Sequence, residues 1–556
     1  MQLTGSDIIV RTLIEQGVDV VFGYPGGQVI HIYDSLYKYQ DELKHVLTAH
    51  EQGASHAADG YARATGKVGV CIATSGPGAT NLVTGIATAY LDSVPVVAIT
   101  GNVPNTVIGT DGFQEIDITG ITLPITKHNY FVGAIEDLAD TIREAFQLAM
   151  SGRPGPVLVD VPKDVQTALY DYEPHAPVLP EEKYAAKDVR IQQAAETINE
   201  AKKPFIYFGG GLISSAAQEE LMALADKIDA PMGCSMMGIS GVPTDHPRFL
   251  GMQGMHGHYA CSTAMHHADL IIALGARFND RVTGNRSKFA KNARIVHIDI
   301  DGAELSKTVN ANHGLRGDMK LTLQKLLPLV NASEKPEWQA HINELRAKEA
   351  SGQDNREGMT PVNILNKLNA YLGPNTPVAT DVGQHQCWAA QYVKFRNTRR
   401  FITSGGLGTM GFGMGAAMGA QMGTGERAVL VTGDGSFGMN LNEMATAVAN
   451  KIPLVILLMN NGVLGMVRQW QTLFFDKHYS NTNLDARQTD FVKLAEAFGA
   501  KASRALTLEE LDAALEKAFA CDGPYLIDCA VGKNEFVLPM LPPGGSMDDI
   551  IVKVGD

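Results

Sequence analysis

Two apolar runs in the last third of the chain, each ended by polar residues, constrain its fold most. Residues 428–432 (Ala-Val-Leu-Val-Thr) lead to Gly433-Asp434-Gly435-Ser436, and residues 453–459 (Pro-Leu-Val-Ile-Leu-Leu-Met) lead to Asn460-Asn461. Such runs are typical of parallel strands that are buried on both faces. Asp434 and Asn461 would then lie at the same sheet edge, where open α/β sheets bind nucleotides and cofactors.

These polar residues predict a cofactor site. Glycines let backbone N–H groups approach a ligand closely, which suits a diphosphate bridged by a divalent cation. Oxygen-only ligands favour magnesium over zinc. Gly-Asp-Gly alone is also a common turn sequence, but the paired asparagines that end the second run favour a cofactor site over a turn that binds nothing.

Strands and helices also alternate in the first third of the chain. Strands are expected at residues 18–22, 45–48, 68–74 and 95–100, and helices at 6–15, 53–63 and 81–91, with Ser6 capping the first helix. This alternation predicts a parallel sheet covered by helices on both faces. Asn81-Leu82, Ile86-Ala-Thr-Ala89 and Pro95-Val-Val97 are echoed by Asn440-Leu441, Met444-Ala-Thr-Ala447 and Pro453-Leu-Val455. The echo predicts that the first and last thirds share a fold.

A chain of 556 residues is too long for one core and suggests about three domains. We expect an α/β protein with domains at 1–165, 189–332 and 360–530, each a mostly parallel sheet flanked by helices. The middle domain has strands near 204–208, 269–274 and 294–298. Residues 165–188 and 333–356 read as linkers. The tail, 531–556, is proline-rich at 536–545 and could cover a site as a lid.

Composition excludes several classes of function. A net charge of −14 argues against a nucleic-acid partner, and a small anionic substrate would need local cations. We expect no signal segment and no membrane span, because the uncharged stretch 405–423 is rich in glycine and suits a loop followed by a buried helix. Six cysteines without a Cys-x-x-Cys pair fit reduced core residues and a cytoplasmic location.

The stretch from Gly433-Asp434-Gly435 to Asn460-Asn461 resembles the cofactor motif of enzymes that use thiamine diphosphate. In that family Asp434, Asn461 and the backbone carbonyl of Val463 would hold the magnesium ion. Glu51, in Ala49-His-Glu, could be a solvated glutamate favoured by a helix dipole. The resemblance instead implies that it exchanges a proton with the aminopyrimidine ring, which requires partial desolvation.

In this family the glutamate and the diphosphate site come from different subunits. The resemblance therefore implies a homodimer or homotetramer with the active site between subunits.

Motifs along the whole chain are similar to those of the acetohydroxyacid synthases, also called acetolactate synthases. They begin at Tyr24-Pro-Gly-Gly27, Ser75-Gly-Pro-Gly78, Phe113-Gln-Glu115, Ile125-Thr-Lys127, Gly152-Arg-Pro154, Gly254-Met-His-Gly257, Asp381-Val-Gly383, Ser404-Gly-Gly406 and Leu464-Gly-Met466. The resemblance implies a biosynthetic transferase of branched-chain amino-acid synthesis. Such an enzyme decarboxylates pyruvate on thiamine diphosphate and passes the hydroxyethyl group to pyruvate or 2-ketobutyrate.

The resemblance also implies roles for individual residues. Catalytic residues would be Glu51, Gly27, Gln114 and Lys127. Thiamine diphosphate contacts would be Pro25, Glu51, Val382, Gly383, Gln384, His385, Gly408, Met410, Gly433, Asp434, Gly435, Ser436, Asn461, Val463, Leu464, Gly465 and Met466. Met410 would prop the cofactor into a bent shape, although a methionine can simply fill a core.

Substrate contacts would come from Phe113, Val382, Arg281, Met466 and Trp470. Lys127 and Arg281 would attract the carboxylate of the 2-ketoacid, and surface ion pairs are the alternative for both. The flat indole of Trp470 would favour 2-ketobutyrate over a second pyruvate as acceptor.

The middle domain of this family holds FAD, which would be structural because the reaction has no net redox change. Its contacts would be Arg153, Gly209, Gly210, Gly211, Met255, His256, Gly257, Gly275, Arg277, Asp280, Arg281, Asp299 and Asp318. Glycines at 209–211 could instead only permit tight packing. The stretch 277–284 marks the flavin-containing biosynthetic branch, and two departures are Asn279, in place of an aspartate, and Met414-Gly415, in place of Leu-Pro.

Alternative functions stay open at this point. A pyruvate oxidase would share the cofactors but use the flavin for electron transfer, and a non-catalytic flavin-binding or regulatory paralogue is the alternative that is not an enzyme. A regulatory small subunit is a possible partner of the synthase.

Overall fold

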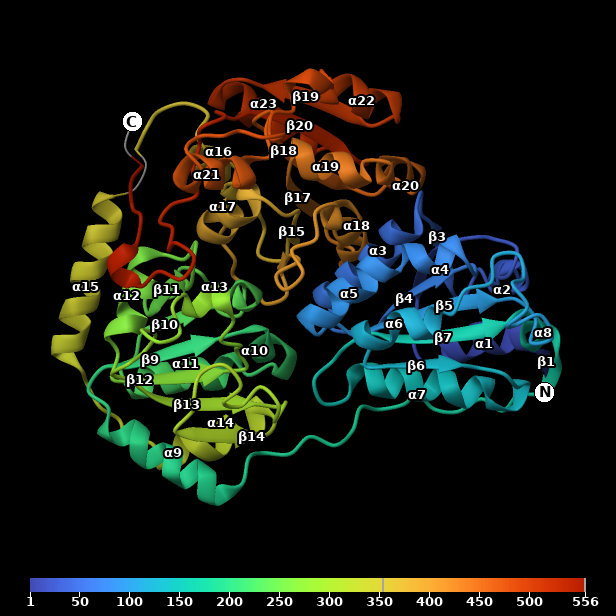
Figure 1. The fold of residues 1–556 in the computed structure, drawn as a ribbon, viewed down its shortest axis with the longest axis horizontal. Coiled ribbons are helices and arrows are strands. Elements are labelled where there is room, and N and C mark those ends of the chain that lie inside the picture. Colours follow the sequence, from blue (N-terminus) through green and yellow to red (C-terminus); the bar gives the residue numbers. More distant parts are fainter. Residues whose placement is uncertain (353–354, 555–556) are drawn as a thin grey trace.

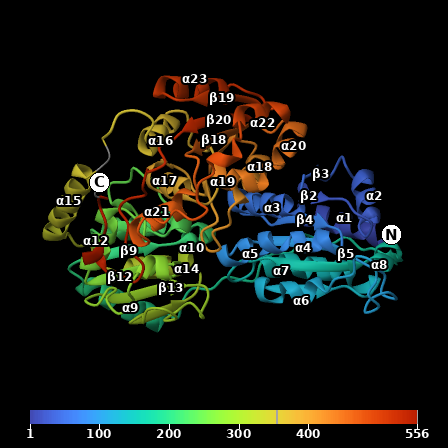
Figure 2. The ribbon, with the colours of Figure 1, turned by 45° about the horizontal axis from the view of Figure 1, so that its top comes forward.

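Three six-stranded parallel sheets, each flanked by helices, form the computed structural model, which describes residues 1–352 and 355–554. Figure 1 shows the first sheet in blue and cyan, the middle one in green and yellow, and the last in orange and red. A view turned by 45° keeps the three layered units distinct (Figure 2). The predicted α/β fold class is therefore confirmed.

The first sheet has the strand order β3-β2-β4-β5-β7-β6. Its strands are β2 (Val20–Tyr24), β3 (Lys44–Leu47), β4 (Gly69–Ala73), β5 (Val96–Asn102), β6 (His128–Phe131) and β7 (Val157–Pro162). Its helices are α1 (Gly5–Glu15), α2 (Ile30–Lys38), α3 (Glu51–Thr65), α4 (Pro77–Asn81), α5 (Val83–Asp92), α6 (Ile118–Thr122), α7 (Leu138–Met150) and α8 (Lys163–Thr167).

Three local predictions for this domain were wrong. The hydroxyl of Thr4, rather than Ser6, caps α1 by accepting from the Asp7 N–H at 3.2 Å. Strand β2 begins two residues later than predicted, because the Val18 N–H still bonds to the Leu13 carbonyl, at 3.1 Å, in the turn that closes α1. The helix predicted at 81–91 begins at Pro77 and is divided into α4 and α5 at Leu82.

The last sheet has the order β16-β15-β17-β18-β20-β19. Its strands are β15 (Val378–Thr380), β16 (Phe401–Ile402), β17 (Ala428–Gly433), β18 (Leu454–Asn460), β19 (Lys501–Ala505) and β20 (Tyr525–Ala530). Its helices are α16 (Pro361–Asn369), α17 (Gln384–Tyr392), α18 (Phe412–Thr424), α19 (Asp434–Asn440), α20 (Glu443–Ala449), α21 (Gly465–Phe474), α22 (Phe491–Ala497) and α23 (Leu508–Phe519). Counted in order of appearance, the strands of both outer sheets lie in the order 2-1-3-4-6-5, so the predicted relation between the first and last domains is confirmed.

The middle sheet has a different order, β11-β10-β9-β12-β13-β14, which is the dinucleotide-binding arrangement 3-2-1-4-5-6. Its strands are β9 (Pro204–Phe208), β10 (Met232–Cys234), β11 (Phe249–Met252), β12 (Leu270–Leu274), β13 (Arg294–Asp299) and β14 (His313–Arg316). Its helices are α9 (Asp188–Glu200), α10 (Gly210–Ser215), α11 (Gln218–Lys227), α12 (Tyr259–His267), α13 (Asp280–Thr283), α14 (Met319–Leu326) and α15 (Pro336–Ser351). The strand order reverses between β9 and β12, which is where such sheets bind ligands.

The two predicted linkers are only partly linkers. Residues 165–171 complete α8 and form β8 (Leu169–Asp171), which pairs antiparallel with β1 (Gln2–Thr4), and only 172–187 cross to the middle domain without a helix or strand. In the second segment, Trp338, Ile342 and Leu345 of α15 are buried against the middle domain. Residues 353 and 354 of that segment lie outside the described residues.

Helices α3 and α18 join the first and last domains at backbone distance (Figures 1 and 2). A Cβ added to Gly419 would lie 1.8 Å from the Ala57 carbonyl oxygen, and one added to Gly60 would lie 2.1 Å from that of Ala416. Gly415, one of the two departures noted above, sits in the same contact, with its Cβ position 2.7 Å from the Gly53 oxygen. The close approach therefore needs glycine at these positions.

The sequence also predicts which parts of the chain are buried. Residues Phe412–Ala420 of α18 are buried, as predicted for the uncharged stretch, and all six cysteines are buried and free. Among the described residues, no helix combines the length and apolar character needed to cross a membrane.

The tail leaves the last domain and runs onto the middle domain, where it is drawn in red in Figure 1. Residues 531–546 contain no helix or strand. The Val537 N–H donates to Gln469 Oε1 at 2.8 Å, and the Leu541 N–H donates to the Met255 carbonyl at 2.8 Å. The tail therefore bridges two domains.

Candidate active site

Asp434 is the first residue of α19, directly after β17, so the predicted turn is the start of a helix. Strands β17 and β18 pair in parallel with Gly433 opposite Met459, which places Asp434 beside the asparagine pair. The side chain of Asp434 is 7% exposed, and burial raises its pKa to about 6 although backbone N–H groups, including that of Asn461, favour the charged form. Within the described part of the chain no cation pairs with it. A buried carboxyl group in this position suits a bound cation.

Asn461 is held in a hydrogen-bonded chain that reaches the tail. Its Oδ1 accepts from the Val463 N–H at 3.2 Å, and its Nδ2 donates to Gln384 Oε1 at 3.3 Å. Gln384 in turn donates to the Glu535 carbonyl at 2.6 Å and to Gln469 Oε1 at 3.0 Å. The predicted metal ligand and the predicted diphosphate contact are therefore neighbours.

His385 packs against the end of β17. A Cβ on Gly433 would lie 2.8 Å from its Nδ1, and its buried Nε2 has no hydrogen-bond partner in the part of the chain that the structure describes. Burial lowers the pKa of His385 to about 3, so the ring is neutral. The free nitrogen is available to a ligand at this edge.

The other predicted thiamine diphosphate contacts of the last domain lie at the same sheet edge. They follow β15 (Val382, Gly383), precede α18 (Gly408, Met410) or lie in the first turn of α19 (Gly435, Ser436). The others precede α21 (Val463, Leu464) or begin it (Gly465, Met466). No group of three or more His, Cys, Asp or Glu side chains in the described residues could hold a metal ion. A cation here would need amide, carbonyl or ligand oxygens in addition to Asp434.

Glu51 begins α3 at the carboxyl edge of the first sheet and is half-buried. Asn81 Nδ2 donates to its Oε2 at 2.9 Å, and a Cβ on Gly78 would lie 3.2 Å from its Oε1. The helix-start position is thus correct, and the carboxylate is also oriented by a specific donor.

Glu443, the first residue of α20 in the last domain, holds the backbone just before Glu51. Its side chain is fully buried and accepts from the His50 N–H at 3.0 Å, the Ala49 N–H at 3.2 Å and the Thr446 hydroxyl at 2.7 Å. Burial raises its pKa, although these hydrogen bonds oppose the change. The last domain therefore fixes the approach to Glu51.

Other residues predicted from the first domain divide between two edges of its sheet. Four of them lie at the sheet edge that also carries Glu51. Pro25 and Gly27 are exposed after β2, and Phe113 is 84% exposed. The Cβ of Gln114 lies 2.9 Å from the Cβ position of Gly76. Lys127 precedes β6 and so lies at the opposite edge. It donates to the carbonyls of Leu148 and Ser151 at the end of α7, and burial lowers its pKa. Within one chain the structure does not bring Lys127 to Glu51, and its role stays a prediction.

Arg281 and Trp470 meet although they belong to different domains. The guanidinium carbon lies 5.9 Å from the centroid of the indole ring, and Trp470 also makes an edge contact with Phe474 at 5.6 Å. Met466 lies one helical turn before Trp470 on α21. A pocket adjoins Arg281 and is lined by Met255, Asp280, Arg281, Gly284, Leu541, Pro542, Pro543 and Gly544. The tail therefore forms one wall of the predicted substrate region.

The predicted FAD contacts of the middle domain gather at the carboxyl edge of its sheet. They follow β9 (Gly209, Gly210, Gly211), β11 (Met255, His256, Gly257), β12 (Gly275, Arg277, Asp280, Arg281) and β14 (Asp318), or end β13 (Asp299). A Cβ on Gly209 would lie 2.4 Å from the Gly275 oxygen, so the glycines do permit tight packing. Burial lowers the pKa of His256 to about 4 and raises that of Asp299 to about 6. Among residues 1–352 and 355–554, His256 Nδ1 has no hydrogen-bond partner.

Several members of this set already have protein partners. Arg153 reaches from the first domain to Asp301 at 3.2 Å and Glu304 at 2.9 Å. Asp318 caps α14. Asn279, which stands where the family has an aspartate, caps α13 by accepting from the Val282 N–H at 3.1 Å. An asparagine thus fulfils the capping role that an aspartate could also fill.

Sequence reasoning missed three polar groups of the site. Asp381 is 1% exposed and accepts from the Gly411 N–H at 2.8 Å, and its position after the apolar run 378–380 is the signal that could have found it. Asn81 was noted only as part of a motif. Glu443 contacts residues that lie 393 and 394 positions before it, and nothing in its local sequence indicates that contact.

Three family models match the chain in order. They are described as the N-terminal thiamine pyrophosphate (TPP) binding domain (residues 3–121), the central domain (191–326) and the C-terminal TPP binding domain (381–529) of thiamine pyrophosphate enzymes. The chain is 46% identical to the acetolactate synthase large subunit of Corynebacterium glutamicum, over 100% of this chain and 91% of that protein. It is 45% identical to acetolactate synthase isozyme 2 large subunit of Escherichia coli, over 99% and 100%. It is also 45% identical to the probable acetolactate synthase large subunit of Methanocaldococcus jannaschii, over 99% and 95%.

Proposed function

We propose that this chain, which belongs to the acetolactate synthase large subunits of the thiamine pyrophosphate enzyme family, joins two 2-ketoacids with loss of carbon dioxide. The products would be 2-acetolactate from two pyruvates, or 2-aceto-2-hydroxybutyrate from pyruvate and 2-ketobutyrate. The observation that carries the proposal is the edge of the last sheet, where Asp434, Asn461, Gln384 and His385 lie together.

Magnesium and the diphosphate fit this edge. Asp434 supplies a buried carboxylate that pairs with no cation of the described residues, Asn461 an amide oxygen, and Val463 a backbone carbonyl that would complete the protein ligands. The unpartnered Nε2 of His385 would bond to a diphosphate oxygen. Bound thiamine diphosphate supplies a thiazolium ring that can accept the electron pair left by decarboxylation.

Glu51 would move a proton at its carboxylate oxygens. The Asn81 amide holds Oε2, and Glu443 fixes the backbone of residues 49 and 50, so the carboxyl group is oriented before the cofactor arrives. Partial burial keeps water from competing for that proton.

Substrate selection would fall to the Arg281 and Trp470 contact. Arg281 is exposed and pairs with Asp280 at 3.7 Å, and it would exchange this surface ion pair for the carboxylate of a 2-ketoacid. The indole of Trp470 would favour the extra methylene of 2-ketobutyrate by about 1 to 3 kcal/mol. The tail residues that line the adjoining pocket would limit access of water.

FAD would bind along the middle sheet as a structural group. The 3-2-1-4-5-6 strand order and the glycine cluster at its switch point support this assignment. A homodimer or homotetramer would supply Glu51 from one subunit and Asp434 from another, as the resemblance to thiamine diphosphate enzymes implies. A regulatory small subunit remains a proposed partner.

The test is acetolactate formation from pyruvate by the purified protein with thiamine diphosphate and magnesium, with and without FAD. Activity that needs FAD but no electron acceptor is the expected result. Pyruvate oxidation that depends on an added acceptor, without acetolactate, would refute the synthase and indicate an oxidase.

A further inference from the structure

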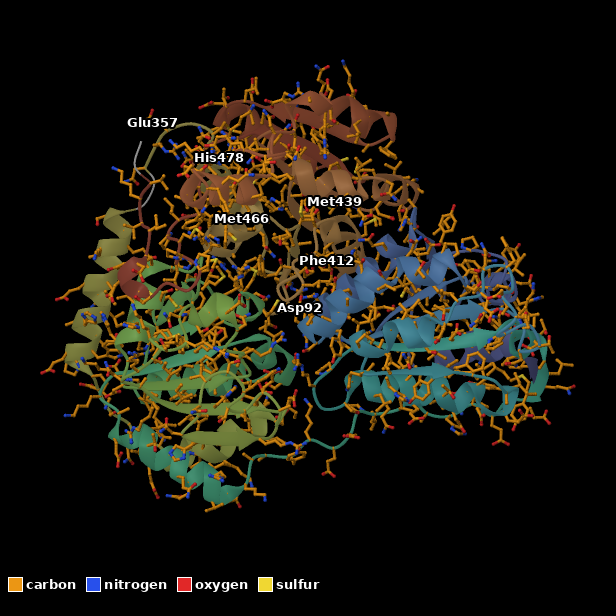
Figure 3. All side chains as sticks on the ribbon, viewed as in Figure 1. Asp92, Glu357, Phe412, Met439, Met466 and His478 are labelled. Carbon is orange, nitrogen blue, oxygen red and sulfur yellow. The ribbon has the colours of Figure 1, made fainter. Side chains whose placement is uncertain are left out.

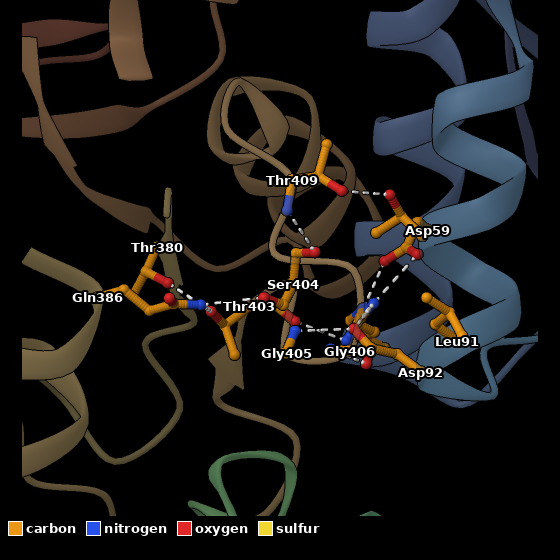
Figure 4. Close-up of polar contacts among 12 residues, drawn as sticks. Asp59, Leu91, Asp92, Thr380, Gln386, Thr403, Ser404, Gly405, Gly406 and Thr409 are labelled. Atoms are coloured by element: carbon orange, nitrogen blue, oxygen red, sulfur yellow. Dashed lines mark hydrogen bonds and ion pairs between the residues drawn. The ribbon is translucent and has the colours of Figure 1, made fainter. Parts of the chain in front are cut away.

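Asp92, the last residue of α5, lies where the three domains meet (Figure 3). Its side chain is fully buried. Its two oxygens accept from two successive N–H groups of the last domain, Oδ2 from Gly405 at 2.9 Å and Oδ1 from Gly406 at 2.7 Å (Figure 4). One carboxylate of the first domain therefore holds the loop that leads to α18.

Arg63 of α3 ties the same loop from its other side. Its NH2 donates to Asp92 Oδ2 at 3.0 Å and its NH1 to the Thr403 carbonyl at 2.7 Å, while its Nε is bound to Asp59. Burial would lower the pKa of Arg63, but the two carboxylates raise it above its usual value. Two acids thus share one cation, and the N–H groups of the loop stabilise the remaining negative charge.

The loop is fixed on both sides of Met410. Before it, the Thr409 hydroxyl bonds to that of Thr88 at 2.7 Å. After it, the Gly411 N–H donates to Asp381 at 2.8 Å and to Ser436 Oγ at 3.2 Å. The clamp upstream of Met410 comes from the first domain, and the clamp downstream comes from the last.

The middle domain reaches the same junction. Arg277 NH2 donates to the carbonyl of Leu91, the residue before Asp92, at 2.6 Å. A Cβ on Gly405 would lie 2.5 Å from Met237 Sδ. All three domains therefore contact this loop, but its residues 405–408 stay exposed, so the carboxylate of Asp92 is what fixes the exposed stretch.

Fold stability alone does not explain this arrangement. Asp59 already neutralises Arg63, and a second buried acid costs desolvation energy that an apolar side chain would avoid. The additional carboxylate instead provides two acceptors in the spacing of two successive N–H groups. We propose that Asp92, supported by Arg63, is a positioning residue that holds the segment from Gly408 to Met410 in the conformation that binds thiamine diphosphate.

This inference rests on the proposed function, because Gly408 and Met410 matter through the cofactor. Its test compares Asp92→Asn with Asp59→Asn. Both variants remove one fully buried carboxylate from Arg63, but only Asp92 accepts from the loop. Asp59→Asn is therefore a control matched in charge, burial and ion-pair partner.

The readouts are the Kd for thiamine diphosphate by calorimetry with excess magnesium, the Tm, and amide hydrogen exchange of residues 403–411 in the cofactor-free protein. We expect Asp92→Asn to raise the Kd about tenfold or more and to speed exchange of the loop, as for the loss of charge-assisted hydrogen bonds. Asp59→Asn should lower the Tm similarly, with the Kd within about twofold of wild type. Equal changes of Kd in the two variants would overturn the proposal.

If Asp92→Asn does not fold, Thr88→Val is the second test, because it removes the first-domain hydroxyl that bonds to Thr409, and with it only a bond to the Thr84 carbonyl of the same helix. A higher Kd at unchanged Tm is expected, and an unchanged Kd would overturn the proposal. Wild-type protein that binds thiamine diphosphate but forms no acetolactate would refute the proposed function and leave the comparison of Kd values intact.

Discussion

Replacing Asp434 with asparagine should make the metal-free protein more stable at alkaline pH and abolish cofactor binding. Burial raises the pKa of this carboxyl group from 3.8 to about 6. That change corresponds to about 3 kcal/mol of unfavourable free energy for the ionised form in the folded state. Asparagine removes the charge but loses one hydrogen-bond acceptor, which costs about 1 kcal/mol. A net gain of about 2 kcal/mol in the free energy of unfolding is expected.

The sign of the pH dependence follows from proton binding. Between about pH 4 and pH 6 folded Asp434 keeps a proton that the unfolded chain has lost, so the free energy of unfolding falls as pH rises through this window. Above pH 6 both states are ionised and the full cost is present. The advantage of Asp434→Asn should therefore be absent near pH 4, grow up to pH 6 and stay constant at pH 8.

The assay is urea denaturation in EDTA at pH 4, 6 and 8, together with calorimetry of thiamine diphosphate in magnesium. Asp160→Asn is a matched control, because burial also raises the pKa of Asp160, within β7 of the first sheet, to about 6. The control should show the same trend in stability with pH and normal cofactor binding. A variant at Asp434 that is less stable than wild type at pH 8 would refute the electrostatic argument, and retained magnesium-dependent binding would refute the ligand assignment.

Three further substitutions address the rest of the site. Glu51→Gln should lower turnover by about 10² to 10⁴ without loss of fold, and near-normal turnover with an unchanged circular dichroism spectrum would remove Glu51 from the proton transfer. Trp470→Leu should reduce the preference for 2-ketobutyrate about tenfold in competition assays; an unaltered product ratio contradicts the acceptor pocket. Glu443→Gln places an amide donor against the N–H groups of residues 49 and 50. It should therefore speed the hydrogen exchange of these two groups and lower kcat about tenfold, while the affinity for thiamine diphosphate stays unchanged. Thr446→Val is its control, and equal exchange in the two variants would argue against a positioning role.

Sequence patterns predicted best what depends on short stretches of chain. The run Pro204–Phe208 forms a strand with the predicted bounds, because five consecutive apolar residues suit a strand buried on both faces. The cofactor motifs follow strand ends, so a parallel sheet necessarily brings them to one edge. The boundaries of the domains stay predictions at the level of single residues.

Errors arose where distant contacts choose between similar local options. Thr4 and Ser6 are both good helix caps, and β1 pairing with β8 fixes the chain so that Thr4 is used. Helix α15 was read as a linker because it is highly charged. Yet Trp338, Ile342 and Leu345 have the spacing of one helical face, and that pattern could have predicted its packing.

The backbone contact between α3 and α18 makes the two outer domains dependent on one another for solubility. Removing the first domain would expose the uncharged face of α18 that carries Phe412, Ala416 and Gly419 to water. Exposed apolar patches of this kind lead to aggregation. Either outer domain expressed alone should therefore be recovered in inclusion bodies, and the pair should unfold in one cooperative step.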